Sequence, residues 1–138
     1  MAVEIKQITT RRGLKEFVKY ENEFYKDCEY FCPQLIQDEL NTFDAKINPA
    51  HEVCEHILFM AYRDGRPVGR IAGIINHAAN AKWNVKHVRF GWIDFIDDEE
   101  VSHSLLDAVV LQLMMFPSFA IQAMMSLMAK RASLRHNR

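Results

Sequence analysis

The chain has 138 residues, enough for one domain built around a single core. It is 49% hydrophobic and 25% charged, a balance typical of globular proteins, which excludes a disordered, collagen-like or repeat-array chain. With 17 basic and 18 acidic side chains, the net charge of −1 gives no electrostatic reason to expect nucleic acid as a partner.

The N-terminal part of the sequence predicts one strand and two helices. Apolar residues interspersed with polar ones over Val3–Ile8 indicate a short, half-buried strand. The hydroxyls of Thr9 and Thr10 are placed to cap a helix, and Pro33 separates this helix from a shorter one that ends near Asp44. The apolar stripe of the first helix consists of Leu14, Phe17, Val18, Phe24, Tyr25 and Cys28.

A β-hairpin follows. The apolar run Ile57–Tyr62 is too short for a helix, and the next residues include Asp64 and Gly65. This pair readily adopts the positive φ angles of a two-residue type I′ turn, so Val68–Ile75 is predicted as the returning strand. Asn76–Asn84 is interpreted as a connection to the next strand.

A third long strand and a helix complete this region. Val88–Ile96 is apolar on both faces, which predicts a central strand buried on both sides. The acidic run Asp97–Glu100 ends this strand, and Ser102 is placed to cap the helix that follows. The stripe of this helix consists of Leu105, Leu106, Val109, Leu113 and Phe116.

The charges divide the chain into two parts. All 18 carboxylates lie at or before Asp107, whereas residues 108–138 carry only basic charges. We therefore separate residues 1–110 from an apolar, Met-rich helical tail with a basic end at residues 111–138, joined through divergence, truncation or a frameshift. An apolar tail with too little core to cover it predicts self-association.

The uncharged stretch Ala108–Ala129 is close to the ~20 residues needed to cross a bilayer. Pro117 and several polar side chains interrupt it, so a buried or interfacial helix is the preferred interpretation and a membrane anchor stays an alternative. The first residues contain no apolar leader, and the three cysteines are too few for a disulfide framework. These features predict a cytoplasmic protein with free thiols.

Cysteine and histidine residues offer one metal-binding alternative. Cys28 and Cys32, together with His51, Cys54 and His56, supply enough thiolate and imidazole ligands for tetrahedral zinc. Their separations match no zinc-finger pattern, and Cys28 also belongs to a helical stripe. The first interpretation therefore expects no metal, and a small zinc-binding domain is the alternative.

The order of these elements resembles the first two thirds of the GNAT N-acetyltransferase fold. Three passages carry the resemblance, which covers about residues 2–110: VEIKQITTRRGLKEFVKYENEFY, ILFMAYRDGRPVGRIAGIINH and VRFGWIDFIDDEEVSHSLLDAVV. The resemblance implies an α+β fold with a mixed sheet flanked by helices, lacking the C-terminal strands of that family. It also implies acyl transfer from acetyl-CoA, used as a cosubstrate, to an amine that the sequence does not identify.

The resemblance implies where acetyl-CoA binds. Backbone groups of Ile93 and Phe95 are expected to hold the pantetheine arm, and the helix N-terminus at Val101, Ser102 and His103 is expected to hold the pyrophosphate. Free amides and the helix dipole favour an anion at such a position. The four preceding carboxylates disfavour it, unless they face solvent while these amides face the ligand.

Asp94 is the candidate catalytic base for this reaction. It shares strand parity with Phe90 and Trp92, which places its carboxylate on an otherwise apolar face where it can accept a proton from an amine. The alternative is a structural role in which Asp94 pairs with Arg89 or with a capping amide. A GNAT-like fragment without catalysis would then act as a protein-interaction module.

Overall fold

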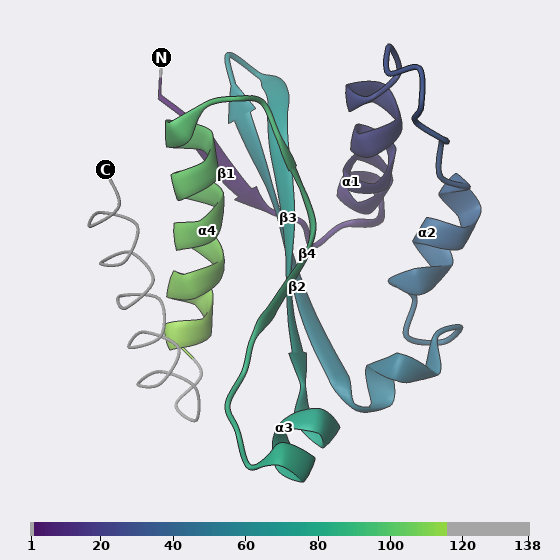
Figure 1. Cartoon of the computed structure of the whole chain (residues 1–138), viewed down its shortest axis with the longest axis vertical. Helices are drawn as coiled ribbons and strands as arrows, with labels where there is room; N and C mark the ends of the chain where they lie inside the picture. The colour runs from purple at the N-terminus through teal and green to yellow at the C-terminus, as the bar shows by residue number, and fades with distance from the viewer. Residues whose placement is uncertain (1, 116–138) are drawn as a thin grey trace.

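A computed structural model describes residues 2–115 and gives an α+β fold, as predicted. A four-stranded sheet in the order β1-β2-β3-β4 lies between α4 on one face and α1 with α2 on the other (Figure 1). The elements are β1 Glu4–Gln7, α1 Arg11–Phe24, α2 Ile36–Thr42, a 3-10 helix η1 Pro49–Glu52, β2 Cys54–Arg63, β3 Arg66–Asn76, α3 His77–Trp83, β4 Arg89–Phe95 and α4 Glu99–Met114.

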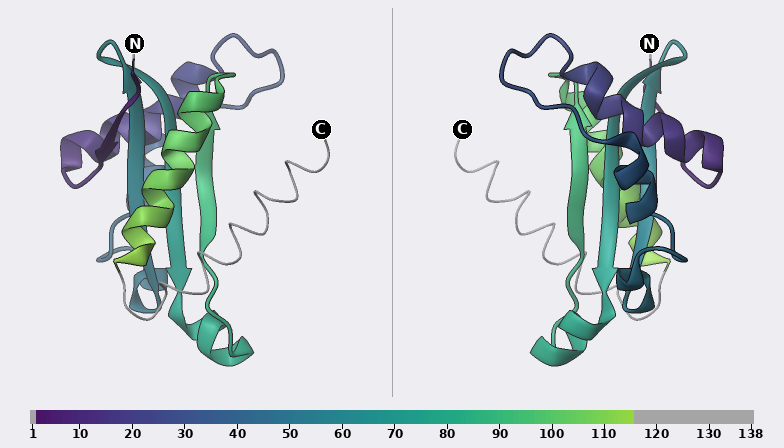
Figure 2. Two further views of the ribbon diagram at one scale, coloured as in Figure 1. Left: turned by 90° about the vertical axis from the view of Figure 1, so that its left-hand side faces the viewer. Right: turned by 90° about the vertical axis from the view of Figure 1, so that its right-hand side faces the viewer.

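The sheet divides the apolar residues into two cores, because successive side chains of a strand point to opposite faces. Figure 2 shows the two covered faces in turn. Below α4 the buried residues are Phe59, Ala61, Ile71, Ile75, Val101, Leu105 and Val109. Below α1 and α2 they are Phe17, Val18, Tyr20, Leu58, Met60, Tyr62 and Ala72.

The local signals at the start of the chain and in the hairpin are confirmed. Thr10 Oγ1 accepts a hydrogen bond from the Gly13 amide at 3.1 Å and caps α1. Asp64 and Gly65 have φ angles of 53° and 73°, as a type I′ turn requires. They join β2 and β3, which pair antiparallel and are each longer than predicted.

The segment Asn76–Asn84 leads from β3 toward β4, as predicted, and most of it is helical. It contains α3, which Asn76 caps by accepting a hydrogen bond from the Ala79 amide at 2.8 Å. Asn84 ends the helix in the left-handed conformation, with a φ of 49°. Two asparagines at the ends therefore define a helix too short to show an apolar stripe.

β4 is an edge strand among the described residues, so the prediction of a central, doubly buried strand is wrong there. Its hydrogen-bonded neighbour is β3, and Phe90 and Ile93 remain 40% and 39% exposed. All three strand pairings are antiparallel, so the expected mixed sheet is not seen within residues 2–115. The apolar character of β4 reflects contact with both cores and an apolar outer edge.

The helix after β4 starts earlier than predicted. α4 begins at Glu99, and Asp98 Oδ1 accepts the hydrogen bond from the Val101 amide at 3.2 Å. Asp98, not Ser102, is therefore the capping residue; the Ser102 hydroxyl donates to the Glu99 carbonyl oxygen at 3.0 Å within the first turn. An aspartate at this position caps as well as a serine and also favours the helix dipole.

The predicted tail is largely outside the described residues. α4 extends to Met114, across the proposed boundary between residues 110 and 111. Residues 116–138, and with them most of Ala108–Ala129 and the proposed self-association, are not described. Within residues 2–115, the helices are too short or too polar to reach across a lipid bilayer.

Two glycines of neighbouring strands provide a test of the packing below α4. A Cβ atom on Gly73 would lie 2.8 Å from Val109 Cγ1, whereas one on Gly91 would meet only Ile74 Cδ1 at an ordinary 3.5 Å. We expect Gly73→Ala to lower the free energy of unfolding by about 1–3 kcal/mol, the usual effect of overpacking. Gly91→Ala, the matched control, should change it by less than about 0.5 kcal/mol in urea titrations; equal effects would contradict this packing.

Candidate active site at the β4 bulge

The ladder between β3 and β4 is interrupted near the middle of β4. Arg70 pairs with Asp94 and Ala72 pairs with Gly91, so Trp92 and Ile93 together lie opposite the single residue between Arg70 and Ala72. Trp92 has a φ of 46°, a left-handed conformation that is strained for a bulky residue. Such a bulge redirects side chains and backbone groups, and strained residues of this kind gather at functional sites.

A buried arginine lies below the bulge. Arg70 of β3 is only 1% exposed. Its Nε donates to Asp94 Oδ2 at 2.8 Å, and its Nη2 donates to Glu21 Oε2 at 2.7 Å. Its Nη1 donates to the Phe17 carbonyl oxygen at 2.9 Å, and the guanidinium lies over the ring of Phe17. Arg70 thus joins α1 to β4 and pairs with two carboxylates, one of which its single charge leaves uncompensated.

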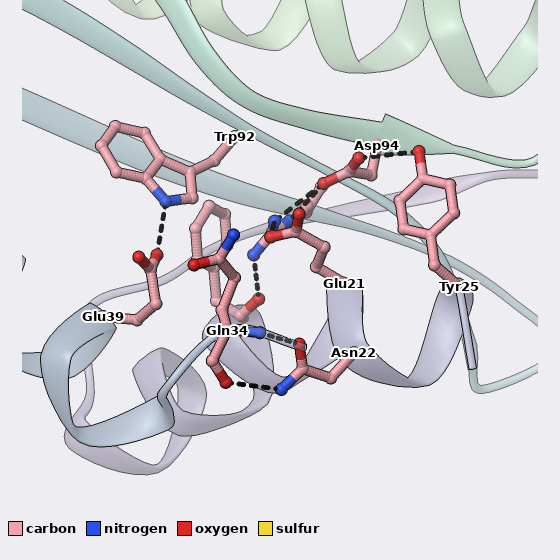
Figure 3. A network of polar contacts seen from close by, with 9 residues as sticks. Glu21, Asn22, Tyr25, Gln34, Glu39, Trp92 and Asp94 are labelled. Carbon is pink, nitrogen blue, oxygen red and sulfur yellow. Dashed lines mark hydrogen bonds and ion pairs between the residues drawn. The ribbon is translucent and has the colours of Figure 1, made fainter. Parts of the chain in front are cut away.

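Two tyrosines of the α1 region complete this network. The Tyr25 hydroxyl donates to Asp94 Oδ1 at 3.0 Å, and burial followed by this hydrogen bond raises the pKa of Tyr25 (Figure 3). The Tyr20 hydroxyl is buried and has no hydrogen-bond partner within residues 2–115. Burial, and next the charge of Asp94, raises the pKa of Tyr20 to about 12. Both phenols are therefore protonated at neutral pH.

An open cleft of about 420 Å³ lies beside this network, lined by Glu21, Arg70, Gly91, Trp92, Ile93 and Asp94. Two carboxylates and one guanidinium give this lining a net formal charge of −1. The Trp92 indole is fixed from α2: its Nε1 donates to Glu39 Oε2 at 2.7 Å, and its ring lies 4.9 Å from that of Phe43. The cleft therefore combines negative charge with a rigid apolar wall.

The loop between α1 and α2 is held back against α1 by a pair of amide hydrogen bonds. Asn22 Nδ2 donates to the Gln34 carbonyl oxygen, and the Gln34 amide donates to Asn22 Oδ1, both at 2.9 Å (Figure 3). This clamp fixes the direction in which the chain enters α2. It thereby helps to hold Glu39 beside Trp92.

Asp94 lies on the same face as Trp92, below α1, but the predicted parity with Phe90 is wrong. Phe90 pairs with Gly73, whose Cβ would meet α4, because the bulge shifts the register between Phe90 and Asp94. The charged partner of Asp94 is Arg70, not the expected Arg89. Ile93 lines the cleft, whereas Phe95 packs into the core below α4. Sequence reasoning missed Arg70 and Glu21, although a lone charge inside the apolar strand β3 was a signal that Arg70 is buried.

The three residues expected at a pyrophosphate site lie at the start of α4. The Val101 amide is bonded to the Asp98 carboxylate, and the Ser102 amide donates to the Asp98 carbonyl oxygen at 3.1 Å. His103 Nε2 lies 3.8 Å from Glu99 Oε1. The amides of Val101 and Ser102 thus already donate hydrogen bonds. Both donate to Asp98, whose side chain is anionic.

Arg63, at the end of β2, pairs with two residues of the acidic run Asp97–Glu100. It contacts Asp98 at 2.7 Å and Glu100 at 2.9 Å, so these two carboxylates face the hairpin. The hydrogen bond from Arg63, followed by that from the Val101 amide, lowers the pKa of Asp98. Asp98 and Glu100 therefore link the start of α4 to the hairpin through Arg63.

This link predicts a pH dependence of stability. A carboxylate whose pKa is lowered by folding stabilises the protein above its unfolded pKa of ~3.9, and this contribution disappears as the pH falls through the folded value. Asp98→Asn keeps both the cap and the acceptor for Arg63. We expect its melting temperature to fall less between about pH 6 and about pH 3 than that of the wild type. Asp97→Asn should retain the wild-type slope, and superimposable curves for all three proteins would refute this link.

The residues proposed for zinc do not form a site. Cys28 and Cys32 are exposed, and His51 Nε2 bonds to the Thr42 carbonyl oxygen at 2.9 Å. The ring of His51 packs against that of His56, whose pKa is lowered by burial and by this neighbour. In the part of the chain that the structure describes, no three His, Cys, Asp or Glu residues are arranged to hold a metal ion.

Comparison with known proteins leaves the activity open. No protein-family model and no solved structure matches the chain. Protein YghO of Escherichia coli (strain K12) is 28% identical to it over 107 residues, which are 75% of this chain and 26% of YghO. The chain therefore spans about a quarter of the length of this relative. The name of YghO states no activity, so a functional assignment must be argued from the geometry of the cleft.

Proposed function

We propose that the chain is a GNAT-like N-acyltransferase domain that transfers an acyl group from acetyl-CoA to an amine. The observation that carries this proposal is the cleft at the β4 bulge. There an outer strand edge without a described neighbour adjoins two carboxylates and a fixed indole. A thioester arm and a basic nitrogen can approach each other at such a place.

The strand edge suits the donor. The outer backbone N–H and C=O groups of an edge strand pair readily with another extended chain, and the pantetheine arm of CoA is an extended chain with two amides. We assign the backbone of Ile93 and Phe95 to this arm. The bulge at Trp92 turns the adjoining backbone away from the regular ladder, which leaves room for the thioester.

The start of α4 suits a pyrophosphate poorly. Asp98 already accepts the Val101 amide, and Glu99 and Glu100 add negative charge in the first turn. A pyrophosphate at Val101, Ser102 and His103 would have to displace the Asp98 carboxylate. We therefore place the binding energy for acetyl-CoA on the pantetheine arm along β4.

The cleft residues have roles in the transfer. The amine nitrogen attacks the thioester carbonyl carbon; the C–N bond forms, the C–S bond breaks, and CoA leaves as a thiolate that takes up a proton. Asp94 accepts the proton that the amine loses, because a carboxylate oxygen with one hydrogen bond retains a further lone pair. Arg70 and Tyr25 orient Asp94 without blocking that lone pair.

A non-catalytic interaction module is the second candidate. It is favoured by the contacts of Asp94, whose two oxygens both accept hydrogen bonds from side chains of the domain, as in a structural ion pair. The exposed Phe90 and Ile93 would then belong to a protein-binding edge. On this alternative acetyl-CoA has no affinity for β4.

Calorimetry with acetyl-CoA separates the two candidates. The acyltransferase proposal predicts a saturable heat with acetyl-CoA at millimolar concentration or below. It also predicts competition by pantetheine alone, because the arm supplies the contacts. Heat that adenosine diphosphate removes and pantetheine does not would contradict the assignment to β4. No heat at millimolar acetyl-CoA would favour the interaction module.

A further inference from the structure

We propose that the cleft at the β4 bulge selects an aliphatic amine in its cationic form that carries no carboxylate, and that Glu21 is the residue that selects it. This inference rests on the proposed acyltransferase function, whose acceptor it names. It follows from the charges of the cleft and from which of its polar atoms already have hydrogen-bond partners among the described residues and which have none there.

The positive charge of the cleft is not available to a ligand. Arg70 is 1% exposed, and its N–H groups are directed at Asp94, Glu21 and the Phe17 carbonyl oxygen. A substrate carboxylate in the cleft would therefore find no cation to pair with and would face the remaining charge of −1. In an open cleft a second carboxylate beside an uncompensated one is repelled. The cleft thus disfavours amino acids and other acidic amines.

The negative charge of the cleft is accessible to a ligand. Glu21 lies in the last turns of α1 with its side chain 22% exposed, and only its Oε2 is bonded to Arg70. Its Oε1 accepts no hydrogen bond from residues 2–115, and Glu21 lines the open cleft beside the network drawn in Figure 3. An ammonium group brings three N–H donors and forms strong, charge-assisted bonds to carboxylates. Glu21 Oε1 and the free lone pairs of Asp94 are the acceptors for two of them. Before the attack the ammonium passes one proton to Asp94, because only the neutral amine has the lone pair that forms the C–N bond. The proton lost after the attack goes to the leaving CoA thiolate.

One buried hydroxyl of α1, that of Tyr20, has no hydrogen-bond partner within residues 2–115. The Tyr20 side chain is 7% exposed. Burial, and next the charge of Asp94, raises its pKa to about 12. A buried hydroxyl without a partner is costly, but Tyr20 does not line the cleft, so the selection rests on Glu21 and Asp94.

The wall of the cleft suits an alkyl chain. Trp92 and Ile93 line it, and Glu39 and Phe43 hold the indole in place. The methylene groups of an alkylamine can lie against this wall while the nitrogen reaches Glu21. A cation close to the indole face is further stabilised.

Three amines with the same four-carbon chain test this selection on the full chain: butylamine, diaminobutane and γ-aminobutyrate. Each has four carbon atoms and one amine end; the far end is uncharged in butylamine, an ammonium in diaminobutane and a carboxylate in γ-aminobutyrate. We expect butylamine and diaminobutane to bind in calorimetry at least about tenfold more tightly than γ-aminobutyrate, the ratio for one unpaired charge. With acetyl-CoA present, the same order is expected for kcat/KM. Equal or tighter binding of γ-aminobutyrate would overturn the inference.

Glu21→Gln tests the residue itself. The amide oxygen still accepts from Arg70, but the negative charge is lost, so amine affinity should fall about tenfold or more while acetyl-CoA affinity stays unchanged. Glu29→Gln, which removes an exposed carboxylate from the α1–α2 loop, is the matched control and should leave amine binding unchanged. Unaltered amine affinity in folded Glu21→Gln would remove Glu21 from this role. The ranking of the three amines is measured on the wild type and does not depend on any variant folding.

The experiment also separates this inference from the proposed function. Acetyl-CoA binding without the expected amine ranking would overturn the inference and leave the acyltransferase proposal. The expected ranking without acetyl-CoA binding would support a cation-selective amine site and overturn the proposal of acyl transfer.

Discussion

Arg70→Met is expected to lower the free energy of unfolding by about 3–5 kcal/mol, because it removes one partner of a buried ionic network. Methionine matches the aliphatic part of arginine, so the loss reports the charge and its hydrogen bonds more than a cavity. Glu21 and Asp94 would remain close together without a cation, and the Phe17 carbonyl oxygen would lose its donor. Urea titration followed by circular dichroism measures the change.

Arg66→Met is the matched control for this prediction. Arg66 lies on the same strand, β3, but is exposed, so its replacement should change the free energy of unfolding by less than about 0.5 kcal/mol. A loss at Arg70 no larger than that at Arg66 would show that the network contributes nothing to stability.

A triple variant then shows whether the loss comes from unpaired charge. Combining Arg70→Met with Glu21→Gln and Asp94→Asn removes the two carboxylates that pair with Arg70. Replacing a whole buried ionic group by neutral residues is often close to neutral. We therefore expect the triple variant to be more stable than Arg70→Met alone, and a further loss of stability would contradict the explanation by charge.

The strands of the hairpin and the first helix could be predicted from the sequence because their signals are local. Asp64 and Gly65 have the positive φ angles that their residue types favour, and Thr10 caps the helix that its position predicts. The place of β4 in the sheet is not a local property, since an apolar strand looks the same at an edge and at the centre. An apolar pattern alone therefore predicts a central strand in either case.

The candidate site also combines features that the local sequence predicts with features that only the fold creates. Counting residues along one strand groups Asp94 with Trp92, as observed, but also with Phe90, which the bulge puts on the opposite face. Arg70 pairs with Asp94 through the register of two strands across a bulge, and Glu21 meets Arg70 only after α1 has packed on the sheet. In the sequence Glu21 belongs to the polar face of a helix. Only the fold turns it toward a buried guanidinium.

Asp94→Asn carries the largest expected effect on activity. If Asp94 takes the proton of the amine, kcat for acetyl transfer should fall ~100-fold or more, the range for loss of a general base. Asparagine keeps the shape, and its carbonyl oxygen still accepts one hydrogen bond. The affinity for acetyl-CoA, which we assign to the backbone of β4, should be nearly unchanged. Steady-state kinetics with butylamine and calorimetry with acetyl-CoA measure the two quantities.

Asp97→Asn is the control for this variant, because Asp97 is an exposed carboxylate just beyond the end of β4. It should keep the wild-type kcat. A folded Asp94→Asn protein with wild-type kcat would return Asp94 to a structural role as the partner of Arg70. A loss of kcat shared equally by both variants would mean that the overall charge near β4 matters and that no single base does. Only a loss confined to Asp94, with acetyl-CoA still bound, supports proton transfer at this carboxylate.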